Sequence, residues 1–262
     1  YIKGAESHGN PVHLLQTLSP MTESLKTWWS RCLKPWAHPR IRTHFWLILG
    51  VGFVLRAVLF WARGDYMAFD EGYYLTLAHN LAEAGEYTLN GWPNRIFSPL
   101  FPLLVAGLKA VGVNLALAGD LVSLLASTAL IFPVFALFWR LSGRWTAIVG
   151  TWGVAVAPSL LAFVTYWFGH EVYVGGAEPL FALFLFSALA LWRRNLGTAV
   201  LLGVLMSLAY LARPEALLPT LLIGVSLAWP SEGWNPFGEK QNWVGALKRG
   251  CVYTLTFFLL IS

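Results

Sequence analysis

The chain has 262 residues, of which 57% are hydrophobic and only 12% are charged, and its formal net charge is +5. Soluble domains average roughly 45–50% apolar and about 25% charged residues, so this composition excludes an ordinary soluble domain and predicts an all-α polytopic membrane protein. The two cysteines, Cys32 and Cys251, are too few and too far apart for a disulfide framework or a cysteine-based metal site.

The N-terminal segment, residues 1–42, is predicted to be a cytoplasmic extension. No acidic residue lies between Glu23 and Asp65. Five basic residues lie just before the first apolar stretch: Lys26, Arg31, Lys34, Arg40 and Arg42. An excess of lysine and arginine marks the cytoplasmic side of a span. Because tryptophans are interleaved with these basic residues, we expect the segment to contact membrane lipids rather than nucleic acid.

The first predicted span covers residues 43–61 and carries Arg56 within it. An arginine at the centre of a span costs about 2.5–3.5 kcal/mol on insertion scales. We therefore expect Arg56 to extend to the outer interface, or to bind a structural partner or a lipid phosphate. Residues 43–262 as a whole are predicted to be a transmembrane module, and the apolar run at residue 262 indicates a module cut from a longer protein.

A polar loop follows, and it contains a predicted amphipathic helix that should lie on the outer membrane surface. Apolar residues recur in it at helical spacing: Tyr74, Leu77, Ala78 and Leu81. Asp70 or Glu71 should cap the start of this helix, where carboxylates are favoured, and Gly85 should end it. The next apolar segment, residues 99–112, is short for a span, which needs about 20 residues.

Further spans are predicted at residues 117–138, 145–164, 178–192, 197–212, 215–229 and from 250 onward. Basic residues lie in three of their connections: Arg140 and Arg144, Arg193 and Arg194, and Lys240, Lys248 and Arg249. All three connections should be cytoplasmic. Only one crossing then fits between the first span and Arg140, so residues 99–112 become a second helix in the outer interface. The prediction is a seven-span module with outer juxtamembrane helices.

Three polar patches then share the outer side: the loop that carries Asp70, residues 165–179 and residues 212–215. Charged groups at the mouth of a membrane bundle are costly unless they pair or function. Carboxylates beside cations suit a site that deprotonates an acceptor and stabilises a phosphate leaving group. Each signal also has a structural explanation, which is a helix cap for Asp70 or Glu178 and a helix-end ion pair for Arg213 with Glu215.

The segment FDEGYYLTLAHNLAEAGEYTLNGWPNRIFSPLFPLLVAGLKAVG, residues 69–112, resembles the first outer loop of the GT-C membrane glycosyltransferases. The likeness is greatest to the protein O-mannosyltransferase (glycosyltransferase family 39) and aminoarabinose-transferase group. There, an Asp-Glu pair after the first span precedes a surface helix, a Gly-x-Tyr step and a Pro-Leu segment. AEPLFALFLF and GVLMSLAYLARPEALLP are similar to two later motifs of the family. The resemblance covers residues 43–229 and implies the family's seven-span N-terminal module.

The resemblance implies an inverting transferase that uses a polyprenyl-phosphate sugar as donor. Its site would lie on the outer face of the cell (plasma or inner) membrane. The match makes Asp70 the base toward the acceptor, Glu71 a supporting residue and Glu178 the second acid. Arg213 is the candidate for the lipid phosphate, because a guanidinium suits bidentate phosphate contact. Three more residues complete the predicted phosphate-binding set: His170, Arg95 and Glu215. No metal ligands are predicted, and a divalent metal is left open as a cofactor.

The chain also differs from these two groups. Phe97 and Ser98 stand where the aminoarabinose group has Glu-Lys, and the mannosyltransferases' His before paired prolines is missing, so the resemblance does not identify the sugar. Two other functions remain open, namely a non-catalytic subunit that serves as a scaffold for other membrane proteins, and a transporter or channel. Transporters usually have acids and broken helices at the membrane centre, whereas the acids here gather at the ends of spans.

Overall fold

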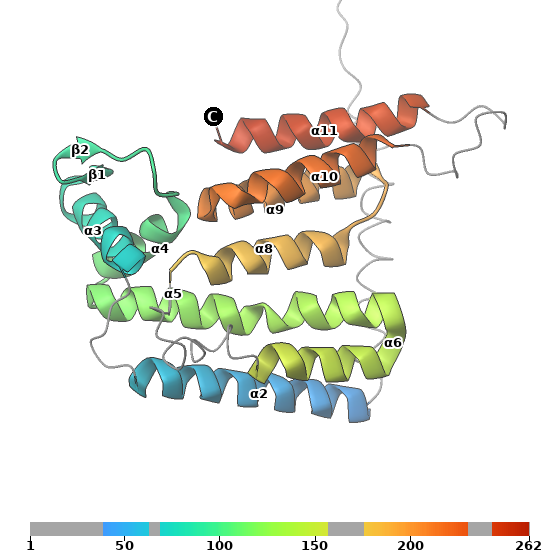
Figure 1. Cartoon of the computed structure of the whole chain (residues 1–262), viewed down its shortest axis with the longest axis horizontal. Coiled ribbons are helices and arrows are strands. Elements are labelled where there is room, and N and C mark those ends of the chain that lie inside the picture. Colours follow the sequence, from blue (N-terminus) through green and yellow to red (C-terminus); the bar gives the residue numbers. More distant parts are fainter. Residues whose placement is uncertain (1–38, 63–68, 157–175, 230–242, 262) are drawn as a thin grey trace, which may run out of the picture. The chain divides into compact units, whose positions relative to one another are not determined.

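The computed structural model describes residues 39–62, 69–156, 176–229 and 243–261 (Figure 1). Contacts divide the chain into residues 1–43 and 44–262, and nearly all of the described residues belong to the second unit. The first described helix, α2, covers Pro39–Ala62. It begins earlier than the predicted span, with a proline in its first turn, where a missing N–H costs little. The rest of the predicted N-terminal extension lies outside the described residues.

Three helical segments are long and apolar enough to cross a membrane: Pro39–Trp61, Leu115–Val156 and Trp243–Ile261. Apart from one small β-hairpin, the described residues form helices and their connections, so the all-α prediction is confirmed for them. Three other predicted spans are helical but fall short of the roughly 20 residues that a span needs. They are α8 (Glu178–Leu191), α9 (Leu196–Ala212) and α10 (Leu217–Ala228). The seven-span count therefore stays a prediction.

The longest apolar segment contains a reversal of the chain. It consists of α5 (Leu115–Ala129) and α6 (Ile131–Val156). The Asn114 side chain caps the start of α5 by accepting hydrogen bonds from two backbone N–H groups. Within α6, Gly143 has φ 82° and ψ −164°, a conformation that is essentially restricted to glycine. The helix breaks there and turns back (Figure 1), so α6 has a first rod, residues 131–142, and a second rod, residues 144–156.

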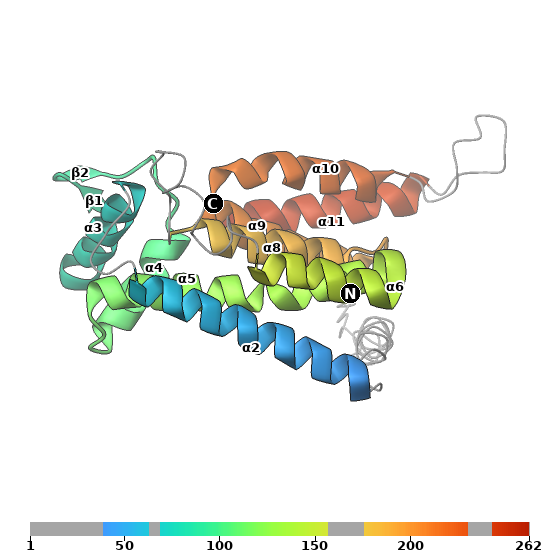
Figure 2. The same ribbon diagram turned by 60° about the horizontal axis from the view of Figure 1, so that its bottom comes forward.

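α3, a β-hairpin and α4 lie together at one end of the longer helices (Figures 1 and 2). Their bounds are Phe69–Ala84 for α3, Thr88–Leu89 and Trp92–Pro93 for β1 and β2, and Leu100–Ala110 for α4. Gly85, with φ 69°, follows α3 as predicted. Asn90 and Gly91 both have positive φ, as a tight two-residue hairpin turn requires.

The predicted apolar stripe of α3 is correct, but it faces the protein. Tyr74 and Ala78 are buried in a core that also contains Phe101 and Val105 of α4 and Val122 of α5. This packing accounts for the helical spacing of the apolar residues. The stripe therefore gives no support for the predicted position of α3 on the membrane surface.

α9 packs between α8 and the last described helix, α11 (Trp243–Ile261). The buried residues of this group include Leu202, Met206, Tyr253 and Phe257. Gly203 allows the close approach of α9 and α11. A Cβ at this position would lie 2.8 Å from the Thr256 Cβ and 3.0 Å from the Tyr253 carbonyl oxygen. Small residues at helix crossings are typical of membrane helix pairs, because they let the backbones approach.

Gly203→Ala should lower the thermal unfolding midpoint of the detergent-solubilised chain. The added methyl group meets backbone and side-chain atoms of α11, and overpacking of this kind costs about 1–3 kcal/mol. Gly107→Ala on α4 is the control, because a Cβ added there would have no atom within 4 Å and alanine is favoured over glycine in helices by roughly 0.5–1 kcal/mol. Equal midpoints for the two variants would contradict the close crossing of α9 and α11.

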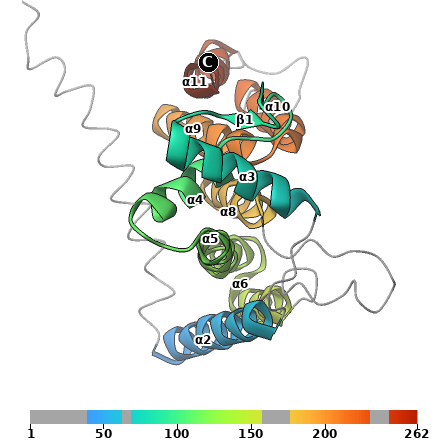
Figure 3. The same cartoon turned by 90° about the vertical axis from the view of Figure 1, so that its left-hand side faces the viewer.

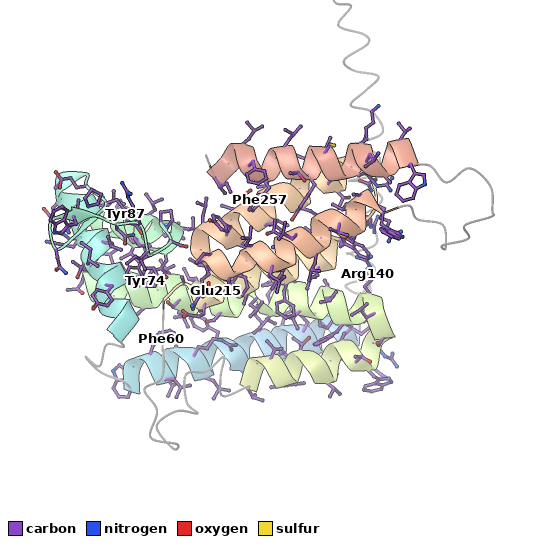
Figure 4. All side chains as sticks on the ribbon, turned by 45° about the horizontal axis from the view of Figure 1, so that its top comes forward. Phe60, Tyr74, Tyr87, Arg140, Glu215 and Phe257 are labelled. Carbon is purple, nitrogen blue, oxygen red and sulfur yellow. The ribbon has the colours of Figure 1, made fainter. Side chains whose placement is uncertain are left out.

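Basic residues gather at the end of the helices opposite α3. Arg140 donates a hydrogen bond to the Ala190 carbonyl near the end of α8 (3.2 Å), and Arg249 Nε donates to the Leu227 carbonyl near the end of α10 (3.3 Å). Figure 4 labels Arg140 at this end, whereas Figure 3 looks toward the end that carries α3 and α4. The placement of this end on the cytoplasmic side stays a prediction.

Candidate functional site

Three charged residues meet at the α3 end, and we call Glu178, Arg213 and Glu215 the Arg213 cluster. Arg213 Nη1 forms an ion pair with Glu178. Arg213 Nε and Nη2 donate to the two carboxylate oxygens of Glu215 at 3.2 and 3.0 Å. The side chains are 27% exposed for Arg213, 43% for Glu178 and 58% for Glu215. One guanidinium thus holds two carboxylates, and the cluster has a formal charge of −1.

The local sequence explains how the Arg213 cluster forms. Pro214 disfavours a helical backbone at the residue before it, so α9 ends at Ala212 and Arg213 is extended, with φ −150° and ψ 133°. Pro214 then opens a short 3-10 helix, η2, which covers Pro214–Ala216 and carries Glu215. Glu178 is the first residue of α8, where a carboxylate interacts favourably with the helix dipole.

Ser123 of α5 fixes the chain immediately before Glu178. The buried Ser123 hydroxyl accepts a hydrogen bond from the Gly176 N–H at 3.0 Å and donates one to the Gly176 carbonyl at 3.5 Å. Gly176 has φ 108°, and a Cβ on it would lie 3.0 Å from Glu178 Oε2. The serine contact and the glycine conformation together determine where α8 begins, and therefore where Glu178 stands.

α3 carries the two predicted catalytic acids at the same end. It begins at Phe69, so Asp70 and Glu71 lie in its first turn rather than at its cap. Glu71 is only 2% exposed; the side chain of Asp70 is outside the part that the structure describes. Tyr74, one helical turn after Asp70, is buried in the same core as Ala177 and Ala212, the residues immediately before Glu178 and Arg213, and Figure 4 labels Tyr74 and Glu215 at the same end. Tyr74 therefore links α3 to the Arg213 cluster.

The loop before α4 is tied to the same end of α9. The Tyr87 hydroxyl lies 3.0 Å from the Phe97 carbonyl oxygen and 3.1 Å from that of Ser98, and it can donate to either. Burial raises the pKa of Tyr87, which keeps this donor protonated. The Ser98 hydroxyl donates to the Tyr210 carbonyl at 3.3 Å. Phe97 and Ser98, which distinguish this chain from the glycosyltransferase groups it resembles, are thus held near the end of α9, just before Arg213.

Electrostatics keep both partners of the exposed pair charged. Burial by itself lowers the pKa of Arg213, but the hydrogen bond with Glu215 and the charges of Glu178 and Glu215 outweigh burial, so the pKa is raised. The hydrogen bond from Arg213 is the main cause that lowers the pKa of Glu215. At neutral pH the guanidinium therefore remains a cation and Glu215 remains a carboxylate.

The Arg213–Glu215 pair should make folding stability depend on pH on the acid side. Because the pKa of Glu215 is lowered by folding, the pair stabilises fully above the ordinary glutamate value of 4.5. This contribution is lost as the pH falls through the lower pKa of the folded state. It should be at most about 1 kcal/mol, because Glu215 is exposed to solvent, which screens the pair. Thermal midpoints measured over the acid range should therefore fall less for Glu215→Gln than for the wild type.

Glu86→Gln is the matched control for this measurement, because Glu86 is an exposed glutamate outside the Arg213 cluster. Its profile should follow that of the wild type. A Glu215→Gln profile parallel to the wild type at every pH would show that the pair does not stabilise the folded chain.

The structure brings together three of the predicted site residues: Glu178, Arg213 and Glu215. Arg95 is exposed in the loop after the hairpin, and within the described residues no hydrogen bond or ion pair joins it to the Arg213 cluster. His170 lies in residues 157–175, outside the described part, as does most of the predicted outer loop at 165–179.

Two residues that support the site were not predicted from the sequence. The sequence does contain a signal for Tyr74, because it lies four positions after Asp70 and side chains at that spacing share a helix face. Ser123 had none, because its contact with Gly176 joins residues that are distant in the chain.

No metal ligands are identified. Among the residues that the structure describes, no group of three or more His, Cys, Asp or Glu side chains is arranged to hold a metal ion. The divalent metal that the sequence left open therefore stays a prediction.

No family model, curated protein or solved structure matches the chain. The resemblance to GT-C glycosyltransferases thus rests on the sequence motifs alone. Any function must be argued from those motifs and from the geometry of the Arg213 cluster.

Proposed function

We propose that the chain is the GT-C-type, seven-span N-terminal module of an integral membrane glycosyltransferase. It transfers a sugar with inversion from a polyprenyl-phosphate donor to an acceptor at the outer membrane face. The observation that carries the proposal is the Arg213 cluster, whose neighbours Ala177 and Ala212 share a buried core with Tyr74 of α3. The cluster joins two sequence motifs that resemble those of the family, and it lies at the end of the helices that bears the Asp-Glu pair of α3.

In the proposed reaction the acceptor oxygen attacks the anomeric carbon of the sugar while the bond from that carbon to the phosphate oxygen breaks. The acceptor proton passes to Asp70, which acts as general base. The electron pair of the broken bond remains on the lipid phosphate, and the Arg213 guanidinium stabilises that charge. Glu71 of α3 supports Asp70 on the acceptor side of this displacement. Glu178 of α8 is the second acid, on the side of Arg213.

Arg213 already has both of its donor edges occupied, which sets a condition on phosphate binding. Nη1 faces Glu178, and Nε with Nη2 faces Glu215. A phosphate can take the Nε–Nη2 edge only if Glu215 turns away. Glu215 is the more exposed of the two acids, and it lies on the short η2 helix, so its movement disturbs less of the core than movement of Glu178 would.

Sugar transfer is the direct test. Membranes that contain the full-length protein should transfer label from a polyprenyl-phosphate sugar to an acceptor, and heat-inactivated membranes should not. A panel of donors is needed, because the sugar is not identified. If no donor in the panel is turned over, while the chain co-purifies with a fixed set of membrane proteins, the scaffold function would replace the proposed one.

The proposed topology has its own test, by cysteine labelling. In a chain with Cys32 and Cys251 replaced, Asn90→Cys at the hairpin turn should react with an impermeant reagent on intact cells. Ser142→Cys, at the turn between the rods of α6, should react only after permeabilisation. The expectation follows from the grouping of basic residues at the Ser142 end. Labelling of Ser142→Cys in intact cells would show that this end of the helices faces outward. It would contradict an active site on the outer face at the α3 end.

A further inference from the structure

Arg56 is a fully buried charged side chain within a membrane-length helix. It is 1% exposed and lies between α2 and the second rod of α6. Arg56 Nη1 donates to the Gly52 carbonyl at 2.9 Å and to the Ala155 carbonyl at 3.1 Å, while Nη2 donates to the Val154 carbonyl at 3.2 Å. These contacts hold the guanidinium in one orientation against the C-terminal end of α6.

The three hydrogen bonds leave part of the guanidinium unused. The group has five N–H donors, and Arg56 Nε is buried without a hydrogen-bond partner. Nη2 has one hydrogen bond, to Val154, so one of its two N–H groups is also left over. Nε and Nη2 form the side edge of the guanidinium, which is the edge that binds two oxygens of a carboxylate or phosphate in parallel.

The charge of Arg56 is not neutralised by its partners either. All three acceptors are uncharged carbonyl groups, and no carboxylate among the described residues forms an ion pair with Arg56. A buried charge without a counterion is costly in an apolar medium. An intramembrane arginine with an unused donor edge is suited to bind an anion, and that edge shows where the anion would bind.

The depth of Arg56 favours a lipid phosphate. Arg56 is six residues before Ala62 at the end of α2, which is about 9 Å along a helix axis. Its acceptors Val154 and Ala155 are next to Val156, where α6 ends. Val58 and Val156, on the two helices, are both exposed, as expected for side chains that face lipid. Membrane phosphates border the hydrocarbon region, and local thinning of the bilayer brings them to an arginine within it.

We infer that Arg56 binds the phosphate group of a membrane lipid on its Nε–Nη2 edge, at the junction of α2 and the second rod of α6. The inference does not rest on the proposed sugar transfer. The phosphate can come from a phospholipid or from a prenyl phosphate, since the donor edge recognises the shared oxyanion.

The test compares lipids that differ only in the phosphate. The full chain is purified in detergent, and its thermal midpoint is measured with phosphatidic acid against diacylglycerol, and with farnesyl phosphate against farnesol. The phosphate-bearing member of at least one pair should raise the midpoint more, and which pair responds identifies the source. If neither pair differs for the wild type, the inference is overturned without any variant.

Variants then assign the effect to Arg56. Arg56→Gln should bind the effective lipid about tenfold more weakly or worse, because it lacks both the charge and the paired donors. Arg144→Gln is the control, since Arg144 is an exposed arginine beside Trp145 at the far turn of α6, and it should bind as the wild type does.

If Arg56→Gln fails to fold, Gly52→Ala replaces it, because a Cβ there would lie 3.0 Å from Arg56 Nη1 and displace the guanidinium. Undiminished phosphate preference in these variants would assign the lipid to another site.

Discussion

Asp70→Asn should abolish sugar transfer by the full-length protein while leaving its expression and fold intact. The substitution keeps the size of the side chain but removes the charge that accepts the acceptor proton, and general-base catalysis contributes about 10²–10⁴-fold. Asp70 lies in the first turn of α3, so the loss of its interaction with the helix dipole should cost only about 0.3–1 kcal/mol of stability. Transfer rate and thermal midpoint, measured on the same preparation, separate the two effects.

Glu71→Gln is the companion variant, because it changes the adjacent acid in the same helical turn. The resemblance makes Glu71 a supporting residue, so its transfer rate should fall less than that of Asp70→Asn. Its midpoint should fall more, because Glu71 is buried and a buried carboxylate is bound by partners that a neutral amide does not replace equally. Near-normal turnover in Asp70→Asn would show that the Asp-Glu pair has only a structural role. Glu178 would then be the next candidate for the general base.

Arg213→Gln should weaken the use of the polyprenyl-phosphate donor by roughly 10–100-fold. Hydrogen bonds to charged groups contribute about 1.5–3 kcal/mol each, and a factor of ten corresponds to about 1.4 kcal/mol. Glu215→Gln should have the opposite effect and lower the KM for the donor, because Glu215 occupies the Nε–Nη2 edge of Arg213 that the phosphate has to take. The measurement is the KM for a short-chain prenyl-phosphate sugar.

Glu178→Gln distinguishes competition from a general change in charge. It removes the same negative charge from the Arg213 cluster, but its partner is Nη1 rather than the Nε–Nη2 edge. The KM should therefore fall less in Glu178→Gln than in Glu215→Gln. Equal changes of KM in both variants would mean that the net charge of the Arg213 cluster alone determines donor binding. An unchanged KM in Arg213→Gln would show that Arg213 does not bind the donor phosphate.

The sequence predicted the helices well where apolar spacing and helix-ending residues agree. Gly85 after α3 and Pro214 after α9 are local signals, and the structure has both helices ending there. The pairing of Arg213 with Glu215 was also predictable, because they are only two positions apart in the chain. In each of these cases the cause acts within one or two helical turns of the residue concerned.

Contacts between residues that are distant in the chain could not be predicted from the sequence. The ion pair of Arg213 with Glu178 joins residues 35 positions apart, and the contact of Arg56 with Ala155 spans 99 positions. Both depend on how helices pack, which apolar spacing does not specify. The burial of Glu71 was missed for the same reason, since its position next to Asp70 gives it the pattern of a surface acid.

The glycine turn within α6 has a mechanical consequence for α2. Phe45 packs on Phe132 and Phe135 of the first rod, with ring centroids 5.0 Å apart in each pair, whereas Arg56 bonds to the second rod. One residue inserted into the second rod before Val154 would rotate the carbonyl groups that follow by about 100° about the helix axis. The acceptor carbonyls would turn away from Arg56 while the aromatic contacts remained. The hydrogen bonds of Arg56 thus depend on the helical register of the second rod, which lies far along the chain from the arginine.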